Sequence, residues 1–343
     1  MRVLQSFPTG LSTNPYLAQL CAHLAPQPEV LGFTWCRALA LRYDVFHVHW
    51  PDSLLHGSGS LRSGGRRLLF RLLLLRLWIG RNRTAVVRTL HDTHGERTDS
   101  RTDRGLLARL DRRTTLWIRL NPATPVSRDR EVRTIQHGDY RGWFAAAGAA
   151  ECVPGLLLYF GLIRPHKGVP DLIEAFTALA TGPDGEAISL HVVGSPTTTD
   201  VGAEVLLAAV ADPRVTVSLG HAGEAELAGE IARAELVVLP YRDLYGSEAS
   251  VLALSLGRPI LVPSDPATEA LRAEVGRGWV FTYPGVLNAA ALASALACCR
   301  AARRDATARP DLSARAWPII ADQHRSAYTT ALALTGTGRR RSG

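Results

Sequence analysis

Leu156-Leu-Leu-Tyr-Phe-Gly-Leu-Ile-Arg-Pro-His-Lys-Gly-Val-Pro-Asp-Leu-Ile-Glu-Ala-Phe176 is the stretch that decides the fold. Its first five residues form an unbroken apolar run, which is typical of a buried strand. Gly161 then opens a turn, and Pro170 stands where the first turn of a helix accepts proline. Apolar residues recur on one face of the segment that follows. The stretch therefore predicts a strand, a turn and a helix, the repeating unit of a parallel α/β sheet.

Two cations stand in this turn, just before the predicted helix. Free N–H groups, the helix dipole and the charges of Arg164 and Lys167 would converge there, which favours a polyphosphate ligand. Lys167 is also the only lysine in 343 residues, since every other cationic side chain is arginine. A lysine ammonium is a compact point charge, which suits a close approach to a diphosphate in a place too narrow for a planar guanidinium. The alternative is that Lys167 has no functional role and stands by chance on a solvent-exposed turn.

Length and composition indicate a globular protein of two domains. A chain of 343 residues with 46% hydrophobic residues can build two cores and is not disordered. The five cysteines are scattered and show no zinc-site spacing, which suits a reducing compartment. Neither a signal peptide nor a spanning segment is apparent. We therefore expect a cytoplasmic protein.

Charge is distributed unevenly along the chain. Residues 1–150 contain 22 arginines against 11 acidic residues, whereas the remainder is slightly acidic. Nucleic acid could partner such a basic half, but no DNA- or RNA-reading motif is visible, so we expect none. An anionic membrane surface, on the inner face of the plasma membrane, or a lipid-diphosphate acceptor suits it better. The arginine-rich helix predicted at 66–79 is either a packed helix with snorkelling arginines or one whose exposed edge rests on a membrane.

Several polar side chains follow predicted strands of the first half. In an open α/β sheet, ligands bind at the carboxyl ends of the strands. We expect His47 to be a hydrogen-bonded core residue, because alternate strand residues face opposite ways. For His49 both orientations stay open. The candidates for contact with an acceptor at this edge are Thr9, Gly10, Asn14, His49 and Trp50.

An acid–base cluster follows the strand predicted at 85–90. Four side chains able to carry protons stand within six residues there: His91, Asp92, His94 and Glu96. Such a cluster can supply the base that deprotonates a hydroxyl nucleophile. We favour His91, because the strand fixes its backbone. Metal binding competes, since His91 and His94 are three residues apart, but no third ligand motif is visible and we predict no metal site.

The quoted stretch also carries a family resemblance. Phe160-Gly-Leu-Ile-Arg-Pro-His-Lys-Gly168 followed by Leu172-Ile-Glu-Ala-Phe176 resembles the start of the donor-binding domain of GT-B glycosyltransferases near family 4. That family grips the diphosphate of a sugar nucleotide with a basic pair at this turn. Leu162 occupies the usual arginine position, and the arginine is Arg164. This variant resembles a subgroup that builds bacterial exopolysaccharides and lipid-linked glycans, including β-mannosyltransferases that use GDP-mannose.

A second donor motif runs from Tyr245 to Pro259. The family has two glutamates spaced E-x7-E here, and this chain has Leu244 and Leu252 in their places. The subgroup has Asn-Ser-Gly-Ser at the helix start, matched by Gly246-Ser-Glu-Ala249. The donor-binding residues that the resemblance implies are Gly161, Arg164, Lys167, Gly194, Tyr241, Ser247, Glu248, Ala249 and Val251.

Further matches extend the resemblance over the whole chain. His49-Trp-Pro51 resembles a strand end of the subgroup, and Ile135-Gln-His-Gly-Asp-Tyr140 resembles its Pro-His-Gly-x-Tyr, which adds His137 to the acceptor side. Trp317 to Tyr328 resembles the closing helix that crosses back to the first domain.

The resemblance implies an α/β GT-B fold, with two doubly wound, Rossmann-like domains facing a central cleft. We expect an acceptor-binding domain at 1–148, a donor-binding domain at 149–315, a crossover helix at 316–334 and a basic tail at 335–343. The implied activity moves a sugar from GDP-mannose or a UDP-sugar to a hydroxyl of a glycan or polyprenyl-diphosphate-linked acceptor. No cofactor is expected besides the nucleotide-sugar co-substrate, and no D-x-D metal motif is convincing.

Two other functions stay open from the sequence. The missing E-x7-E and the residue Glu248 would suit a catalytically silent, glycosyltransferase-like binding subunit. The basic first half would suit a nucleic-acid-binding protein, although less well. The donor sugar, the acceptor and the stereochemical outcome are also left open.

Overall fold

The computed structural model describes residues 1–9, 14–56, 60–91, 100–145, 150–241, 248–302 and 308–337. The chain forms two compact units, one of Met1–Gly138 with Arg315–Gly343 and the other of Asp139–Ala314. The sequence predicts a domain boundary between residues 148 and 149, whereas residues 139–145 pack with the second unit.

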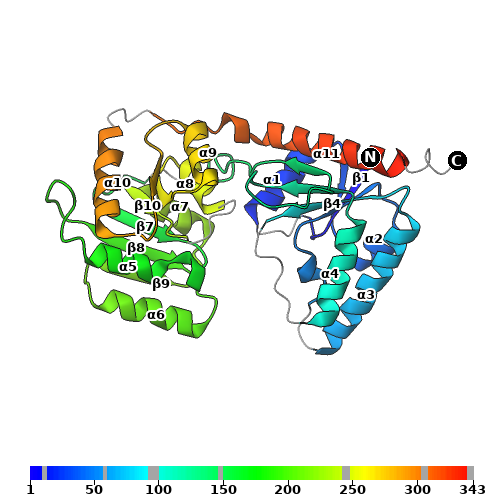
Figure 1. The fold of residues 1–343 in the computed structure, drawn as a ribbon, viewed down its shortest axis with the longest axis horizontal. Helices are drawn as coiled ribbons and strands as arrows, with labels where there is room; N and C mark the ends of the chain where they lie inside the picture. Colours follow the sequence, from blue (N-terminus) through cyan, green and yellow to red (C-terminus); the bar gives the residue numbers. More distant parts are fainter. Residues whose placement is uncertain are drawn as a thin grey trace. The chain divides into compact units, whose positions relative to one another are not determined.

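The first unit is built on a six-stranded, fully parallel sheet in the order β2-β1-β3-β4-β5-β6 (Figure 1). Its strands are β1 (Arg2–Gln5), β2 (Glu29–Leu31), β3 (Val45–Val48), β4 (Ala85–Leu90), β5 (Leu116–Arg119) and β6 (Val132–Thr134). Its helices are α1 (Pro15–Leu24), α2 (Trp35–Ala40), α3 (Ser60–Ile79), α4 (Arg101–Arg113) and α11 (Trp317–Thr337), with a 3-10 turn η1 (Pro51–Leu54).

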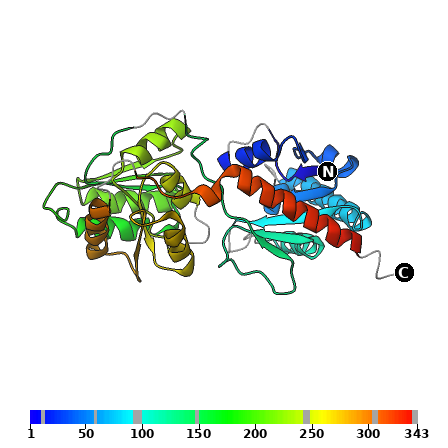
Figure 2. The ribbon, with the colours of Figure 1, turned by 90° about the horizontal axis from the view of Figure 1, so that it is seen from above.

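Helices cover both faces of this sheet. Val3 of β1 points to a core shared with α1 and α11, whereas the next residue, Leu4, points to a core shared with α2, α3 and α4. This alternation is the two-residue period of a strand that is buried on both faces. Helix α11 runs along the first unit, as the resemblance implied (Figure 2).

The second unit repeats the plan with a parallel sheet in the order β12-β11-β10-β7-β8-β9. Its strands are β7 (Leu156–Phe160), β8 (Ser189–Gly194), β9 (Val215–Leu219), β10 (Leu236–Val238), β11 (Ile260–Pro263) and β12 (Val280–Tyr283). Its helices are α5 (Val169–Thr177), α6 (Thr199–Val210), α7 (Glu224–Arg233), α8 (Glu248–Ser255), α9 (Pro266–Val275) and α10 (Ala289–Ala302), with a short turn η2 (Pro165–Lys167). A further short turn, η3 (Ser313–Arg315), lies where the chain returns to the first unit.

Both sheets reverse their strand order at one point. In the first unit the chain moves outward from β1 to β2 and then returns to place β3 on the other side of β1. In the second unit the same reversal lies between β7 and β10. At such a reversal the loops that follow the two neighbouring strands lead away from each other and leave a crevice. Ligands of doubly wound sheets bind in this crevice, at the carboxyl ends of the strands. The predicted doubly wound α/β architecture is confirmed for each unit.

None of the helices in the described ranges has the length and apolar content that crossing a membrane requires.

Candidate active site

At the carboxyl edge of the second sheet, the backbone that follows β7 packs closely against the end of β8. A Cβ atom on Gly194 would lie 2.0 Å from the carbonyl oxygen of Gly161, so only glycine fits there. The Gly161 N–H donates to the carbonyl of Val193 at 3.0 Å, and the Ile163 N–H donates to that of Ser195 at 2.9 Å. The loop after β7 is therefore anchored before it reaches the cationic turn.

A left-handed glycine sets the entry into α5. Gly168 has φ of 65°, and a Cβ atom there would lie 2.4 Å from the carbonyl oxygen of Pro240, which follows β10. No side chain caps α5, and Pro170 lies in its first turn. The positive end of this helix consequently lies at the reversal between β7 and β10.

Lys167 lies over an aromatic ring at this point. Its Nζ is 3.4 Å from the centroid of the Tyr241 ring, and Tyr241 follows β10. The Tyr241 side chain is 3% exposed, and its ring meets Tyr159 edge-on with 6.4 Å between centroids. The Tyr159 hydroxyl donates to the carbonyl of Leu162 at 2.9 Å. The packed rings of Tyr241 and Tyr159 thus hold a fixed surface beneath the Lys167 ammonium. Arg164, which is half-buried, directly precedes the same turn.

The carboxyl edge of the first sheet presents a pair of histidines. His49 follows β3 and His91 follows the neighbouring strand β4. Nδ1 of His49 lies 2.9 Å from Nε2 of His91, which is a hydrogen bond. The Trp50 ring stacks on the His91 ring with 4.0 Å between centroids and 25° between planes.

His47 is a buried core residue, and this prediction is confirmed. Its Nε2 lies 2.8 Å from the hydroxyl of Thr89, and its Nδ1 lies 2.9 Å from the hydroxyl of Tyr328 on α11. Burial lowers the pKa of both His47 and His49 well below the ordinary value, and neighbouring histidines lower it further. Both rings are therefore neutral near pH 7.

Tyr16 of α1 lies at the centre of the aromatic cluster. Its ring contacts those of His49, His91 and His137, with centroid distances of 6.1, 5.6 and 4.4 Å. His137 is buried, and its Nδ1 lies 3.0 Å from the carbonyl of Gly138. Tyr16 cannot be recognised as a site residue from the sequence, because it occupies an ordinary apolar position of a predicted helix.

Relatives of known activity resemble the chain over most of its length. A GDP-mannose:glycolipid 4-beta-D-mannosyltransferase of Xanthomonas campestris pv. campestris, strain ATCC 33913, is 41% identical over 325 residues, which cover 95% of this chain and 90% of that protein. A second protein of the same description from this pathovar is 40% identical over the same shares. The chain belongs to this mannosyltransferase family. It is a glycosyltransferase, although no protein-family model matches it.

Solved structures of other glycosyltransferases share the fold of this mannosyltransferase. AviGT4, a glycosyltransferase involved in avilamycin A biosynthesis, has a TM-score of 0.57 at 14% identity, covering 97% of this chain and 98% of its own. Anabaena Alr3699/HepE, crystallised with UDP, has a TM-score of 0.57 at 16% identity, covering 100% and 99%. The fold is therefore that of GT-B glycosyltransferases, as the sequence resemblance implied.

The predicted donor residues of the mannosyltransferase differ in where the structure places them. Gly161, Arg164, Lys167, Gly194 and Tyr241 gather at the carboxyl edge of the second sheet, and Glu248 and Ala249 begin α8. Val251 instead packs into a cluster with Tyr140, Phe144 and Ala228, so any donor contact must come from its backbone. Leu252, which replaces a family glutamate, packs against the core. Ser247 lies outside the described residues.

The structure describes some of the residues that were predicted to contact the acceptor. Asn14 caps α1 by accepting a hydrogen bond from the Leu17 N–H at 3.2 Å, and Thr9 lies against Gly32. Gly10, Asp92, His94 and Glu96 lie outside the described residues, so His91 is the member of the predicted acid–base cluster that the structure places. Within the described ranges, no three His, Cys, Asp or Glu side chains gather as metal ligands.

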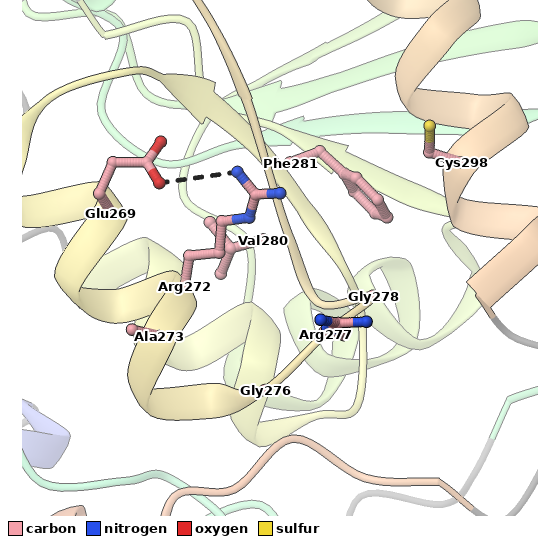
Figure 3. Close-up of a pocket in the computed structure, with 9 residues that line it drawn as sticks. All are labelled: Glu269, Arg272, Ala273, Gly276, Arg277, Gly278, Val280, Phe281 and Cys298. Atoms are coloured by element: carbon pink, nitrogen blue, oxygen red, sulfur yellow. Dashed lines mark ion pairs between the residues drawn. The ribbon is translucent and has the colours of Figure 1, made fainter.

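A surface pocket of the second unit lies at the wrong edge for the donor. Figure 3 shows it between α9, the start of β12 and α10, with Arg277 and Phe281 at its wall and Arg272 paired to Glu269. The Arg272 guanidinium lies 3.6 Å from the Glu269 carboxylate. The glycines that line it, Gly276 and Gly278, precede β12. It therefore opens at the amino ends of the strands, opposite to the edge at which doubly wound sheets bind ligands.

Proposed function

We propose that this mannosyltransferase transfers mannose from GDP-mannose to a hydroxyl of a lipid-linked glycan and forms a β-mannosidic bond. The support is the 41% identical relative whose name states that donor, a glycolipid acceptor and a β product. The structural observation that carries the proposal is the ammonium of Lys167 over the Tyr241 ring, at the start of α5 and at the strand-order reversal.

Lys167, Arg164 and the amino end of α5 would hold the diphosphate of the donor. When the bond between mannose C1 and the diphosphate oxygen breaks, the departing GDP takes the electron pair and gains negative charge. Fixed cations and a helix dipole stabilise that charge as it develops. We propose that these groups do so without a metal ion.

His91 is the base that we propose for the acceptor hydroxyl. Mannose is α-linked in GDP-mannose, so a β product requires inversion, in which the acceptor oxygen attacks C1 as GDP leaves. The acceptor must lose its proton, and a positioned imidazole is suited to take it near neutral pH. His91 stands directly after β4, at the ligand-binding edge of the first sheet. Asp92, His94 and Glu96 are the alternative bases.

We further propose that the outer face of α3 rests on an anionic membrane, where a glycolipid acceptor resides. Phe70, Leu73 and Leu77 bury one side of α3 in the core. The opposite side exposes a stripe of apolar side chains at helical spacing, namely Leu68, Leu72, Leu75 and Ile79, together with Trp78. Ile79 is 71% exposed and Trp78 is 59% exposed.

Arginines flank this α3 stripe. Arg71, Arg109 and Arg112 are exposed and line one hollow with Trp78 and Leu75, and α4 lies beside α3 in Figure 1. An apolar stripe with cations at its border is the pattern of an interfacial helix that inserts shallowly among anionic headgroups. The enzyme would then act peripherally at the inner face of the plasma membrane.

A thermal-shift series tests the donor. GDP-mannose, GDP, UDP-glucose and UDP are added separately to the enzyme at a concentration well above the expected Kd. A ligand at 100 times its Kd stabilises the folded state by about 2.7 kcal/mol, which raises Tm by several degrees. We expect a shift with GDP-mannose and GDP. A shift with the uridine nucleotides and none with the guanosine nucleotides would overturn the donor assignment.

A further inference from the structure

We infer that His49 is a positioning residue for the transfer reaction, because its hydrogen bond to Nε2 of His91 fixes that imidazole with Nδ1 as its proton-accepting nitrogen. The inference rests on the proposed function, in which His91 is the base. It gives His49 a role other than the contact with the acceptor that its place in the sequence suggests.

The backbone and ring of His49 are held from several sides. The His49 N–H donates to the hydroxyl of Ser6 at 3.0 Å, which ties β3 to the residue that follows β1. The Phe7 ring meets the His49 ring edge-on, with 5.4 Å between centroids and 70° between planes. The His49 side chain is 2% exposed. These contacts hold the ring in one orientation, so it can orient a neighbouring side chain.

His91 is the polar neighbour that His49 orients. Nδ1 of His49 lies 2.9 Å from Nε2 of His91, and Nε2 of His49 has no hydrogen-bond partner among the described residues. Trp50 stacks on the His91 ring, so two successive residues after β3 fix the position of His91. Because His49 engages Nε2 of His91, Nδ1 is the nitrogen left for proton exchange with a substrate. Nδ1 is itself buried, so an acceptor must displace the atoms that cover it.

The direction of this hydrogen bond decides whether His91 can act as a base. If Nε2 of His91 donates to the lone pair on Nδ1 of His49, then Nδ1 of a neutral His91 carries a lone pair and can accept a proton. If the bond runs the other way, Nδ1 of His91 already carries a proton. Burial keeps His49 neutral, and the groups that face it are His47, His91, His324 and Tyr16. A neutral ring can present the required lone pair.

The transfer step moves one proton to His91 and one electron pair to GDP. The acceptor hydroxyl gives its proton to Nδ1 of His91 while its oxygen bonds to mannose C1 and GDP leaves with the electron pair of the broken bond. His91 becomes an imidazolium, and its Nε2–H stays hydrogen-bonded to neutral His49. An acceptor for that N–H stabilises the cation, so His49 raises the proton affinity of His91. The proton passes to solvent when the product leaves.

Substitution of His49 tests the inference in the full enzyme. His49→Leu removes the hydrogen bond, and His49→Asn places an amide oxygen near the position of Nδ1. We expect kcat to fall about 10-fold to 100-fold in His49→Leu, with GDP affinity unchanged and the acidic limb of the pH profile moved to lower pH. His49→Asn should recover part of the loss. In His91→Ala, the additional change His49→Leu should cost little more.

A spectroscopic readout separates this inference from the proposed function. In protein labelled with 15N-histidine, the His91 resonances, identified by their loss in His91→Gln, should report a proton on Nε2 and none on Nδ1. They should change in His49→Leu but not in His324→Leu, which removes another buried histidine. A proton on Nδ1 of His91, or unchanged turnover in His49→Leu when His91→Ala is impaired, would overturn the inference. Normal turnover in His91→Ala would instead overturn the base assignment on which it rests.

Discussion

The ammonium nitrogen of Lys167 lies 3.4 Å from the centroid of the Tyr241 ring. The two residues reach the same place from different strands, since Lys167 follows β7 and Tyr241 follows β10. The negative face of an aromatic ring attracts a cation and restricts its side chain. The chain's only lysine is therefore held in position at the reversal of the strand order, where a diphosphate would bind.

Lys167→Ala should weaken the binding of GDP about 10-fold to 100-fold. The loss corresponds to one charged hydrogen bond, worth about 1.5–3 kcal/mol. Titration calorimetry with GDP measures the change in Kd. Arg272→Ala is the matched control, because Arg272 is an exposed cation of the same unit near the amino end of β12. Equal GDP affinity in wild type and folded Lys167→Ala would refute the assignment of Lys167.

Tyr241→Phe and Tyr241→Leu should differ in donor affinity. Phenylalanine keeps an aromatic face beneath the ammonium, whereas leucine removes it together with a contribution of about 0.5–2 kcal/mol. We expect GDP to bind Tyr241→Phe nearly as well as wild type and Tyr241→Leu several-fold more weakly. Melting temperatures establish that both variants fold. If both substitutions reduced affinity equally, the hydroxyl rather than the ring face would be responsible.

The outer face of α3 should bind anionic vesicles. The triple variant Leu72→Ser, Leu75→Ser and Ile79→Ser removes exposed apolar area without touching the buried side of the helix. Sedimentation with vesicles that contain phosphatidylserine should fall about tenfold or more, because each buried leucine contributes up to about 1.5–3 kcal/mol. Binding of the wild type should also decline as salt rises.

Helix α6 supplies a control for this experiment. Leu206, Leu207 and Val210 are exposed apolar side chains of the second unit, and their change to serine removes a similar area. We expect that variant to sediment like wild type. An equal loss in both triple variants, or equal sedimentation with neutral vesicles at every salt concentration, would rule out an electrostatic membrane surface on α3.

The buried histidines should make the protein sensitive to acid. Burial lowers the pKa of His47 and His49 well below the ordinary value and lowers that of His324 to about 4. Below about pH 6.5 the unfolded chain binds protons that the folded protein excludes, so the free energy of unfolding falls as pH drops. Each such histidine contributes up to about 1.4 kcal/mol per pH unit in this range.

Urea denaturation between pH 7.5 and 5.5 measures that slope. His324→Leu removes one of the three groups and should make the slope shallower. His221→Gln replaces an exposed histidine and should leave it as in wild type. The same slope in wild type and His324→Leu would mean that His324 is not a source of the acid sensitivity.

Much of the donor side could be predicted from the sequence, because it is local. Gly161, Lys167 and Pro170 stand within ten residues of one another, and their order along the chain already specifies a strand, a turn and a helix start. The parallel sheets follow from the same repeating unit. Contact of Tyr241 with Lys167 is different, because it depends on which strand neighbours β7.

The histidine network could not be predicted from sequence, because its bonds join distant segments. His49 meets His91 only because β3 and β4 are adjacent, and Tyr328 reaches His47 from the last helix. The α3 stripe is a similar case. Its sequence is apolar nearly all round, so the outer face becomes identifiable only once the inner face packs into the core formed with the sheet, α2 and α4.

Transfer of radiolabelled mannose into lipid tests the central claim most directly. The enzyme is incubated with a lipid-linked oligosaccharide fraction and labelled GDP-mannose, and label is counted in the organic extract before and after β-mannosidase treatment. The account predicts label that depends on the enzyme, that β-mannosidase releases, and that labelled UDP-glucose does not supply. An extract that is labelled equally from UDP-glucose, or from which only an α-mannosidase releases mannose, would contradict it.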